Sequence, residues 1–329
     1  MISLTLKFKC LIGVAGVVFM VSCAPASRMT SDIKTELINW QAESENIVNL
    51  SVLLEDEGIE GSPALLNKNT LIFESKKSDN YDLWSIDTEK KGGIVLLTNY
   101  EGPDRLPCAH PDGKRYIFLS DRSQTGYYLG ESGKSTVISL VEVSQPYTGL
   151  YTRGDISPDG NTFIYPSGKF IWTYDLNSKT KTQYVQGTEP RWSPDGTKII
   201  FRKLAKEVFP GMFSTSIWMM NSDGTEQTEL IAGDSNFSFS GACISPDGKK
   251  ILYLKARIIK RYDAVDFLNP DIWICNIDGS DHTQITTNPL SDQEAIWIDN
   301  QTIVFSSDRP QSGNFDERKW DLWKAKINF

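Results

Sequence analysis

Short apolar segments recur along the chain from about residue 46 to its end, and polar turn residues bound each of them. Four of these segments end in an aromatic residue and follow a turn at the same offset: Tyr116–Phe118, Phe163–Tyr165, Ile199–Phe201 and Ile251–Tyr253. Short runs of β-branched and aromatic residues between turns are typical of β-strands. The pattern therefore predicts an all-β chain of many short strands joined by tight corners.

The corner before each of these segments carries the pattern x-Pro-Asp-Gly. Its copies occupy residues 110–113, 157–160, 193–196 and 245–248. Proline presets φ in such a turn, and glycine supplies the positive φ needed to re-enter a strand. Two further segments have the same strand pattern but are not preceded by a Pro-Asp-Gly motif: Leu71–Phe73 and Ile303–Phe305. The copies recur at roughly 35 to 50 residues, which brackets the period of β-propeller blades.

Each repeat unit also contains three other strand-like segments. An aromatic-rich segment such as Ile217–Met219 precedes a second turn, and a fourth strand is expected near Leu97-Thr98 or Ile285-Thr286. The residues before each corner, such as Pro190–Trp192, supply an inner strand. Four strands in each of the six units predict a six-bladed β-propeller of four-stranded blades.

Closure of the ring is predicted from the two ends of this repeat region. The last unit reaches a third strand at residues 324–327, whereas the strand-like residues 46–53 have no blade before them. Pairing the two segments would remove the exposed sheet edges that an open array leaves. We therefore expect residues 46–53 to complete the last blade.

The first residues predict export from the cytoplasm. Lys7 and Lys9 precede a short apolar run that ends at Ser22 and Cys23, which is typical of a signal peptide spanning residues 1–22. Residues 20–23 resemble a bacterial lipobox, so we expect Cys23 to be lipidated and residues 23–45 to tether a propeller of residues 46–329. The alternative is ordinary secretory cleavage. Alanine at position 24, directly after Cys23, resembles the sorting preference of outer-membrane lipoproteins. The sequence does not determine the leaflet of that membrane.

Charge and motif content exclude several classes of function. The chain has 34 basic and 42 acidic residues, a net charge of −8, so nucleic acid is not an expected partner. It contains no Gly-x-Ser-x-Gly, His-Glu-x-x-His or Cys-x-x-Cys motif. With His110 and His282 as its two histidines, a histidine-rich metal site is excluded. We predict no catalytic set, no metal and no cofactor, and we expect Cys108, Cys243 and Cys275 to be buried thiols.

The repeat resembles a known family. Ser-Pro-Asp-Gly-x-x-Ile-x-Phe, followed by Asp-x-Trp, Asp-Gly and Leu-Thr, is similar to the PD40 repeat of TolB-like propellers over residues 46–329. The Ser-Asp-Arg triplets at 120–122 and 307–309 also match, and we expect them to form ion pairs between blades. The resemblance implies a binding or scaffold role in the bacterial envelope. A complete TolB has an α/β domain before the propeller, for which residues 24–45 are too few.

The candidate binding face is the one with long loops, because binding residues concentrate on loops carried by a rigid scaffold. The segments 202–215 and 255–270 are the longest of these expected loops. The aromatic and basic residues on this face, the usual anchors of protein interfaces, are Phe209, Phe213, Arg257, Arg261, Tyr262, Phe267, Phe315 and Arg318. They predict a non-catalytic lipoprotein that binds an envelope protein or polysaccharide. The alternative is that the aromatics cap blade edges.

A second candidate site is a charged funnel at the central channel. Its residues are Arg105, Arg153, Asp155, Glu189, Arg191 and Glu294. Paired carboxylates serve as acid and base in glycoside hydrolysis when their spacing is right. The alternative function is therefore a carbohydrate-active enzyme or sugar-binding sensor that uses Asp155, Glu189 and Glu294.

Overall fold

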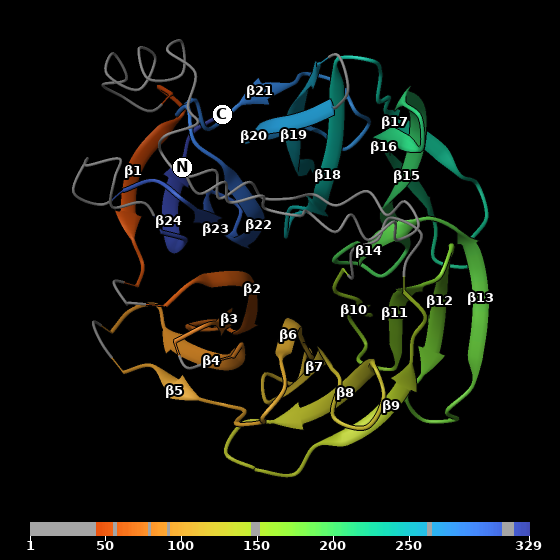
Figure 1. Cartoon of the computed structure of the whole chain (residues 1–329). Helices are drawn as coiled ribbons and strands as arrows, with labels where there is room; N and C mark the ends of the chain where they lie inside the picture. The colour runs from red at the N-terminus through yellow and green to blue at the C-terminus, as the bar shows by residue number, and fades with distance from the viewer. Residues whose placement is uncertain are drawn as a thin grey trace, which may run out of the picture.

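The computed structural model describes residues 44–54, 58–77, 80–90, 93–145, 152–261, 265–310 and 319–329. In these residues the strands form six antiparallel four-stranded sheets, which stand around a central axis like the blades of a propeller (Figure 1). The predicted all-β, six-bladed architecture is confirmed. The predicted lipidation site Cys23 lies outside the described residues. No helix among the described residues is long and apolar enough to cross a membrane.

The first three blades follow the chain from an inner strand A to an outer strand D. Blade 1 contains β2 (Glu60–Asn67), β3 (Thr70–Ser75), β4 (Asp82–Asp87) and β5 (Val95–Leu96). Blade 2 contains β6 (Asp104–Ala109), β7 (Arg115–Ser120), β8 (Gly126–Glu131) and β9 (Ile138–Glu142). Blade 3 contains β10 (Asp155–Ile156), β11 (Thr162–Ser167), β12 (Phe170–Asp175) and β13 (Lys181–Gln186).

The last three blades have the same order, but two of them have much longer central strands. Blade 4 contains β14 (Thr188–Trp192), β15 (Lys198–Phe209), β16 (Met212–Asn221) and β17 (Thr228–Ile231). Blade 5 contains β18 (Phe237–Ile244), β19 (Lys250–Lys260), β20 (Val265–Asn276) and β21 (Thr283–Gln284). Blade 6 contains β22 (Asp292–Asp299), β23 (Thr302–Ser307), β24 (Asp321–Ile327) and β1 (Ile47–Val52).

The ring closes through β1, as the sequence predicts. This N-terminal strand pairs antiparallel with β24, with Leu50 opposite Ala325, and forms the outer strand of blade 6 (Figure 1). Just before it, the Asn46 side chain donates a hydrogen bond of 3.1 Å to the Gln284 carbonyl in the outer strand of blade 5. The N-terminal segment therefore links the last two blades as well as closing the ring.

The Pro-Asp-Gly corners form the tight turns that their residues predict. In blade 3 the Ser157 hydroxyl donates to Asp159 at 2.5 Å and accepts a bond of 2.9 Å from the Thr162 N–H. Gly160 has φ +75°, a conformation that side chains rarely adopt. The serine and aspartate thus satisfy the polar groups of the turn, and glycine makes the reversal without steric cost.

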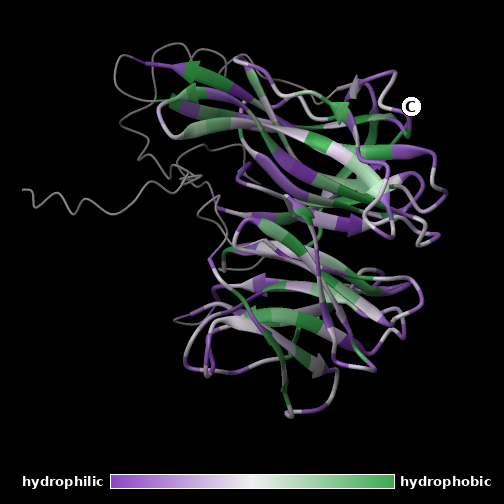
Figure 2. Cartoon of the chain, turned by 90° about the vertical axis from the view of Figure 1, so that its right-hand side faces the viewer, coloured by the Kyte–Doolittle hydropathy of each residue, from purple (hydrophilic) through white to green (hydrophobic). Residues whose placement is uncertain are grey.

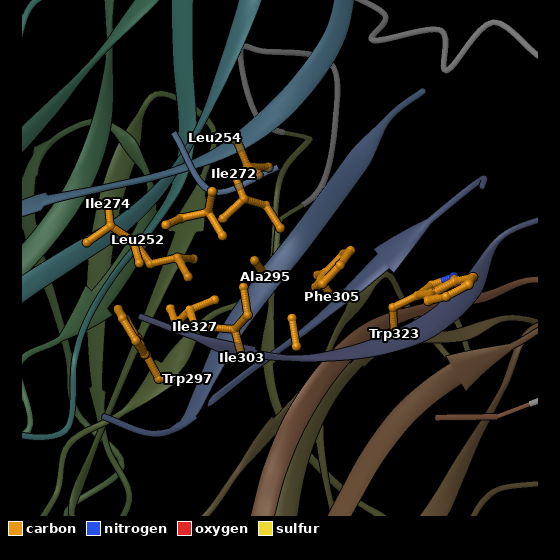
Figure 3. Packing of buried hydrophobic residues seen from close by; sticks show 12 residues of the cluster. Leu252, Leu254, Ile272, Ile274, Ala295, Trp297, Ile303, Phe305, Trp323 and Ile327 are labelled. Carbon is orange, nitrogen blue, oxygen red and sulfur yellow. The ribbon is translucent and has the colours of Figure 1, made fainter. Parts of the chain in front are cut away.

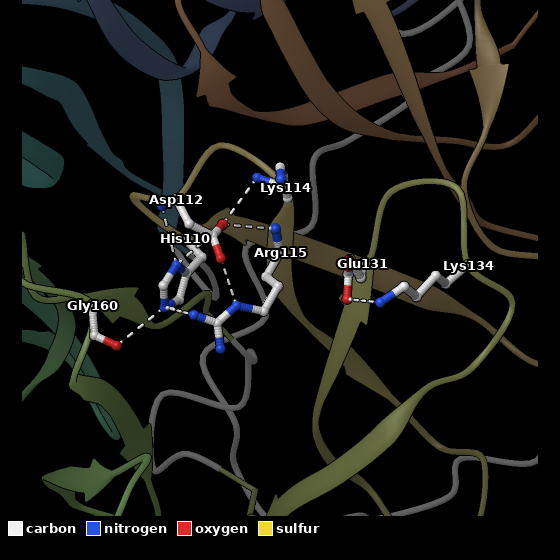
Figure 4. Close-up of polar contacts among 7 residues, drawn as sticks. All are labelled: His110, Asp112, Lys114, Arg115, Glu131, Lys134 and Gly160. Carbon is white, nitrogen blue, oxygen red and sulfur yellow. Dashed lines mark hydrogen bonds and ion pairs between the residues drawn. The ribbon is translucent and has the colours of Figure 1, made fainter.

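Blade 2 has His110 in place of that serine, and its imidazole contacts the next blade. The His110 Nε2 lies 3.1 Å from the Gly160 carbonyl oxygen, and Arg115 forms an ion pair of 2.6 Å with Asp112 (Figure 4). His110 is buried, so the contact lies between two packed corners. The His110 side chain therefore links the corner of blade 2 to the corner of blade 3.

The core lies between the blades, because strands such as β3 and β7 are buried along five consecutive residues. Successive residues of a strand point to opposite faces, so both faces of these sheets pack against a neighbouring blade. The hydrophobic segments lie along the strands in Figure 2. The largest cluster fills the space between blades 5 and 6 (Figure 3). Its fully buried members include Leu252, Ile272, Ile303, Phe305 and Ala325. Each large apolar side chain buried in this way contributes about 1.5–3 kcal/mol to folding, so every blade depends on both neighbours.

Three details differ from the sequence-based expectations. The segments 202–215 and 255–270 are not loops, because strands β15–β16 and β19–β20 continue through them. The outer strands fall at 95–96 and 283–284, just before the expected Leu97-Thr98 and Ile285-Thr286. Arg122 and Arg309 pair with Asp104 and Asp292 inside their own blades, so the expected ion pairs between blades are wrong. These buried aspartates begin the inner strands, where each cation satisfies a carboxylate removed from water.

Candidate functional site

Two long β-hairpins distinguish blades 4 and 5 from the rest of the ring. We call β15–β16 the blade 4 hairpin and β19–β20 the blade 5 hairpin. β14 pairs with β15 only as far as Arg202, and β18 pairs with β19 only as far as Arg257. Beyond those positions each hairpin is a two-stranded ladder. The ladder of blade 4 ends in a turn at 210–211, and that of blade 5 is described as far as the pair Lys260 and Val265. The hairpins therefore extend past their blades on the face opposite the Pro-Asp-Gly corners.

The two hairpins pack against each other through an apolar cluster of their own. Val208 on the blade 4 hairpin is buried together with Ile258 and Val265 on the blade 5 hairpin, and Phe209, Met212 and Phe267 pack against them. A two-stranded hairpin is marginally stable alone. Through this cluster each hairpin packs against the two strands of the other, which stabilises both. Phe209 and Phe267, predicted as binding aromatics, are thus partly buried between the hairpins.

Most of the exposed charged residues around this cluster are basic, with Glu207 as the acidic exception. Arg257 and Lys260 on β19 and Lys206 on β15 are exposed, and Arg261 forms an ion pair of 2.7 Å with Asp266. Phe213 is half-buried and lies opposite Glu207 in the blade 4 hairpin, away from the apolar cluster. The predicted binding residues Tyr262, Phe315 and Arg318 lie outside the described residues. Of the eight predicted binding residues, the structure places five on the paired hairpins: Phe209, Phe213, Arg257, Arg261 and Phe267.

The channel mouth is built on bulges in the inner strands. The bulge residues have a left-handed backbone, and four of them are not glycine: Ser62, Leu106, Glu189 and Glu294, with Gly241 as the fifth. A left-handed conformation costs a non-glycine residue about 1–2 kcal/mol. The bulge also turns backbone groups out of the ladder, where they need another partner.

Carboxylates from neighbouring blades supply that partner. In each case the N–H of a bulge residue donates to a side chain of the preceding blade. The pairs are Ser62 with Glu294, Leu106 with Glu74 and Gly241 with Glu189. Asp155 of blade 3 accepts a similar bond of 2.8 Å from the Trp192 N–H of blade 4. The predicted funnel carboxylates are therefore latches between blades.

Two of the latches are also ion pairs. Arg105 binds Glu74 at 2.6 Å, and Arg202 binds Glu189 at 2.9 Å. Burial raises the pKa of Glu74, and Arg105 opposes that rise. Sequence reasoning missed Glu74 and Arg202. Both directly follow the aromatic residue of the B strand, at Phe73 and Phe201, so a blade-by-blade alignment of that position would have found them.

The other two predicted funnel arginines have a different environment. Arg153 donates to the Pro63 carbonyl of blade 1, and Arg191 donates at 3.1 Å to the Gly154 carbonyl of blade 3. Burial, and then the positive charge of Arg191, lower the pKa of Arg153 to about 10. Burial raises the pKa of Asp155, which lies near both arginines. Among the described residues, neither arginine has a carboxylate within ion-pair distance.

The thiols and histidines of the described residues form no reactive or metal-binding set. Cys108, Cys243 and Cys275 are unpaired, and burial raises their thiol pKa values to about 12, about 11 and about 12. Thiols with raised pKa are poor nucleophiles. Over the described ranges, no three His, Cys, Asp or Glu side chains are grouped so as to hold a metal ion.

Sequence comparison relates the chain to TolB. No family model matches it. The chain is 22% identical over 226 residues to the Tol-Pal system protein TolB of Francisella tularensis, a match that covers 66% of this chain and 48% of that protein. It thus spans about half the length of the curated relatives it matches.

Structure comparison gives the same fold. A putative TolB from Agrobacterium tumefaciens superposes with a TM-score of 0.57 at 16% identity, covering 85% of this chain and 94% of the other. An oligogalacturonate lyase from Vibrio parahaemolyticus superposes with a TM-score of 0.55 at 11% identity, covering 88% and 96%. Identities this low establish the fold and not the activity.

The repeat, the six blades and the two comparisons together define the class of this protein, which is a six-bladed β-propeller. Within that class it is TolB-like in both sequence and fold.

Proposed function

We propose that this chain is a non-catalytic binding protein of the bacterial cell envelope, anchored through lipidated Cys23, whose paired hairpins bind an envelope protein or polysaccharide. Similarity to proteins of the Tol-Pal system supports an envelope location and a macromolecular partner. The prediction of a signal peptide and a lipobox-like sequence supports the anchor. Location in the outer membrane rests on Ala24 alone and belongs to the same proposal.

The observation that carries this proposal is the pair of hairpins with its own apolar cluster. Strands β15, β16, β19 and β20 extend beyond the four-stranded blades, so their outer halves add nothing to the cores between blades. Ordering those residues costs about 1–2 kcal/mol each in backbone entropy. The cluster of Val208, Ile258 and Val265 offsets that cost and makes a rigid projection. A rigid surface on one face is what a binding protein needs, because less order is lost when the partner docks.

Local charge supports an acidic partner. The whole chain has a net charge of −8, whereas the exposed positions of the hairpins include Lys206, Arg257, Lys260 and Arg261. A basic patch attracts an acidic surface. Carboxylate groups on an envelope protein or an anionic polysaccharide fit that patch.

The contacts of the funnel carboxylates weigh against the alternative of a carbohydrate-active enzyme. Asp155, Glu189 and Glu294 each accept a bond from a backbone N–H of the following blade. A general acid or base must exchange its proton with substrate, whereas these carboxylates are already engaged with backbone N–H groups of the ring. These residues therefore hold neighbouring blades of the ring together.

The path of the chain supports presentation of the hairpins away from the anchor. β1 begins opposite Ile327, at the end of β24 that lies on the face of the tight corners. The segment that leads from the proposed anchor thus joins the propeller on the face opposite the hairpins.

The proposal is tested by capture of the partner in intact cells after chemical crosslinking. The test variant is Arg257→Glu/Lys260→Glu, and the control is Lys114→Glu/Lys181→Glu, which changes net charge equally on the corner face. We expect the first variant to lose the captured partner and the control to keep it. Equal capture by both variants, with unchanged melting temperatures, would refute the hairpin surface as the binding site.

A further inference from the structure

The arginines of the channel mouth fall into two classes by partner. Arg105 and Arg202 are each neutralised by a glutamate, Glu74 and Glu189, at ion-pair distance. Arg153 and Arg191 contact backbone carbonyls only, through one nitrogen each. A guanidinium has five N–H donors, so both keep most of their hydrogen-bonding capacity. Both residues are partly exposed, and neither has a fully buried side-chain nitrogen that lacks a hydrogen-bond partner.

Arg153 and Arg191 lie close enough to affect each other. Arg191 reaches the Gly154 carbonyl, next to Arg153 in the chain, and its charge lowers the pKa of Arg153. Two guanidiniums that repel each other at one place form a site where a single anion relieves the repulsion. A carboxylate matches the planar fork of a guanidinium and binds it with charge-assisted hydrogen bonds.

The backbone around these arginines is fixed before any ligand arrives. The Tyr127 hydroxyl donates at 2.6 Å to the Thr152 carbonyl, and the Thr152 and Thr188 hydroxyls are 3.1 Å apart. Arg191 lies in β14, paired with Ile200 of β15. A site whose residues are already positioned spends little binding energy on ordering them.

Two carboxylates near the same arginines limit the charge of the ligand. Asp155 and Glu294 both interact electrostatically with Arg153, although each places its oxygens on backbone N–H groups of blades 4 and 1. Their negative charge would repel a polyanion and would tolerate one carboxylate. Cys108 and Cys243 border the arginines and carry no charge, because burial raises their thiol pKa values.

We propose that Arg153 and Arg191 form a binding site for a small monocarboxylate at the channel mouth, separate from the hairpin surface of the proposed function. The ligand's carboxylate accepts hydrogen bonds from both guanidiniums, which bridges blades 3 and 4. The site needs no metal and no cofactor, and it involves no covalent step.

The test is a titration of the purified, unlipidated full propeller followed by NMR of the arginine Nε–H groups. The probe is N-acetylglycine, and its neutral analogue N-acetylglycinamide reports binding that needs no carboxylate. We expect N-acetylglycine to shift the Arg153 and Arg191 signals and to bind about tenfold more weakly to Arg153→Gln. The matched control Lys181→Gln removes the same charge at an exposed position on the corner face and is expected to bind like wild type.

A second variant separates loss of the site from loss of fold. Arg191→Lys keeps the charge and the blade core, and it loses the planar fork, so we expect several-fold weaker binding with an unchanged melting temperature. Equal binding of the acid and the amide by wild type would overturn the proposal. Equal weakening in Arg153→Gln and Lys181→Gln would also overturn it, because the effect would then come from net charge.

Discussion

Glu294 in β22 accepts hydrogen bonds from both the backbone N–H and the hydroxyl of Ser62 in β2, a residue 232 positions earlier in the chain. This contact joins blade 6 to blade 1 at the channel, whereas β1 joins the ends of the chain at the outer rim. Both residues have a left-handed backbone, with φ of 53° and 50°. The ring is therefore closed at its inner and its outer edge.

The inner closure predicts a measurable loss of stability in Glu294→Gln. Glutamine keeps one acceptor oxygen and loses the charge, while its amide nitrogen cannot accept from Ser62. We expect the free energy of unfolding, measured in urea, to be about 1–2 kcal/mol lower than that of wild type. Glu101→Gln, at an exposed position, serves as the control and is expected to change little. A Glu294→Gln variant as stable as wild type would show that this contact does not contribute to closure of the ring.

The contact between His110 and Gly160 is tested by two matched glycine substitutions. A Cβ at Gly160 would lie 2.8 Å from His110 Cε1, whereas a Cβ at Gly248 meets nothing within 4 Å. Their φ values are +75° and +74°, so both changes carry the same backbone strain. We expect Gly248→Ala to cost about 1–2 kcal/mol and Gly160→Ala to cost more, as measured by chemical unfolding. Adding His110→Ser should remove the excess; an equal cost for the two alanines would contradict a packed His110.

The apolar cluster between the hairpins predicts local rather than global destabilisation. Ile258→Ala removes a buried side chain that contacts the blade 4 hairpin, and Ile259→Ala changes the next residue, which is only partly buried. We expect Ile258→Ala to cost about 2–3 kcal/mol within the hairpins. Amide hydrogen exchange at the outer ends of β15, β16, β19 and β20 should accelerate while the blade cores stay protected. The cluster would have no role if Ile259→Ala had the same effect.

The corners predict how stability responds to acid. The serine hydroxyls of the corners, followed by backbone N–H groups, lower the pKa values of Asp159, Asp195 and Asp247 below 3.8. The unfolded chain thus binds more protons at these aspartates, and stability is lost as pH falls through and below 3.8. Burial raises the pKa values of Glu74 and Asp155. The folded chain therefore binds more protons at these two groups, and their contribution to stability rises as pH falls, but at higher pH than the loss at the corner aspartates.

A serine substitution isolates that effect. Ser193→Ala/Ser245→Ala removes two of the hydroxyl donors, so the pKa values of Asp195 and Asp247 should move back toward 3.8. We expect the variant to be less stable than wild type near neutral pH, with a difference that shrinks in acid. Ser222→Ala, outside these corners, is the control. A difference that is constant with pH would contradict a role for the aspartate charges.

The blades could be predicted because their information is local. Within one corner, Ser157, Asp159 and Gly160 satisfy one another, so the residue types alone determine the turn. Closure was also predictable, because only residues 46–53 and 324–327 lacked partners in the repeat. The outer parts of the hairpins are not predicted as strands, because residues 203–207 do not alternate cleanly between apolar and polar and bulges interrupt their register.

The roles of the charged residues could not be predicted, because their partners are distant in the chain. Arg153 contacts Pro63, 90 positions away, and Glu189 contacts Gly241, 52 positions away. Sequence analysis placed Arg153, Glu189 and Glu294 at the channel and could not tell a latch from a ligand site. Only the partner of each charge makes that distinction.

The claim that the paired hairpins are the binding surface is tested most directly by site-specific photo-crosslinking in cells. A photoreactive residue is placed at position 257 on the blade 5 hairpin or, for comparison, at position 114 on the corner face. We predict that position 257 crosslinks to one envelope partner and that position 114 does not. Crosslinks to the same partner from position 114, with none from position 257, would contradict the account.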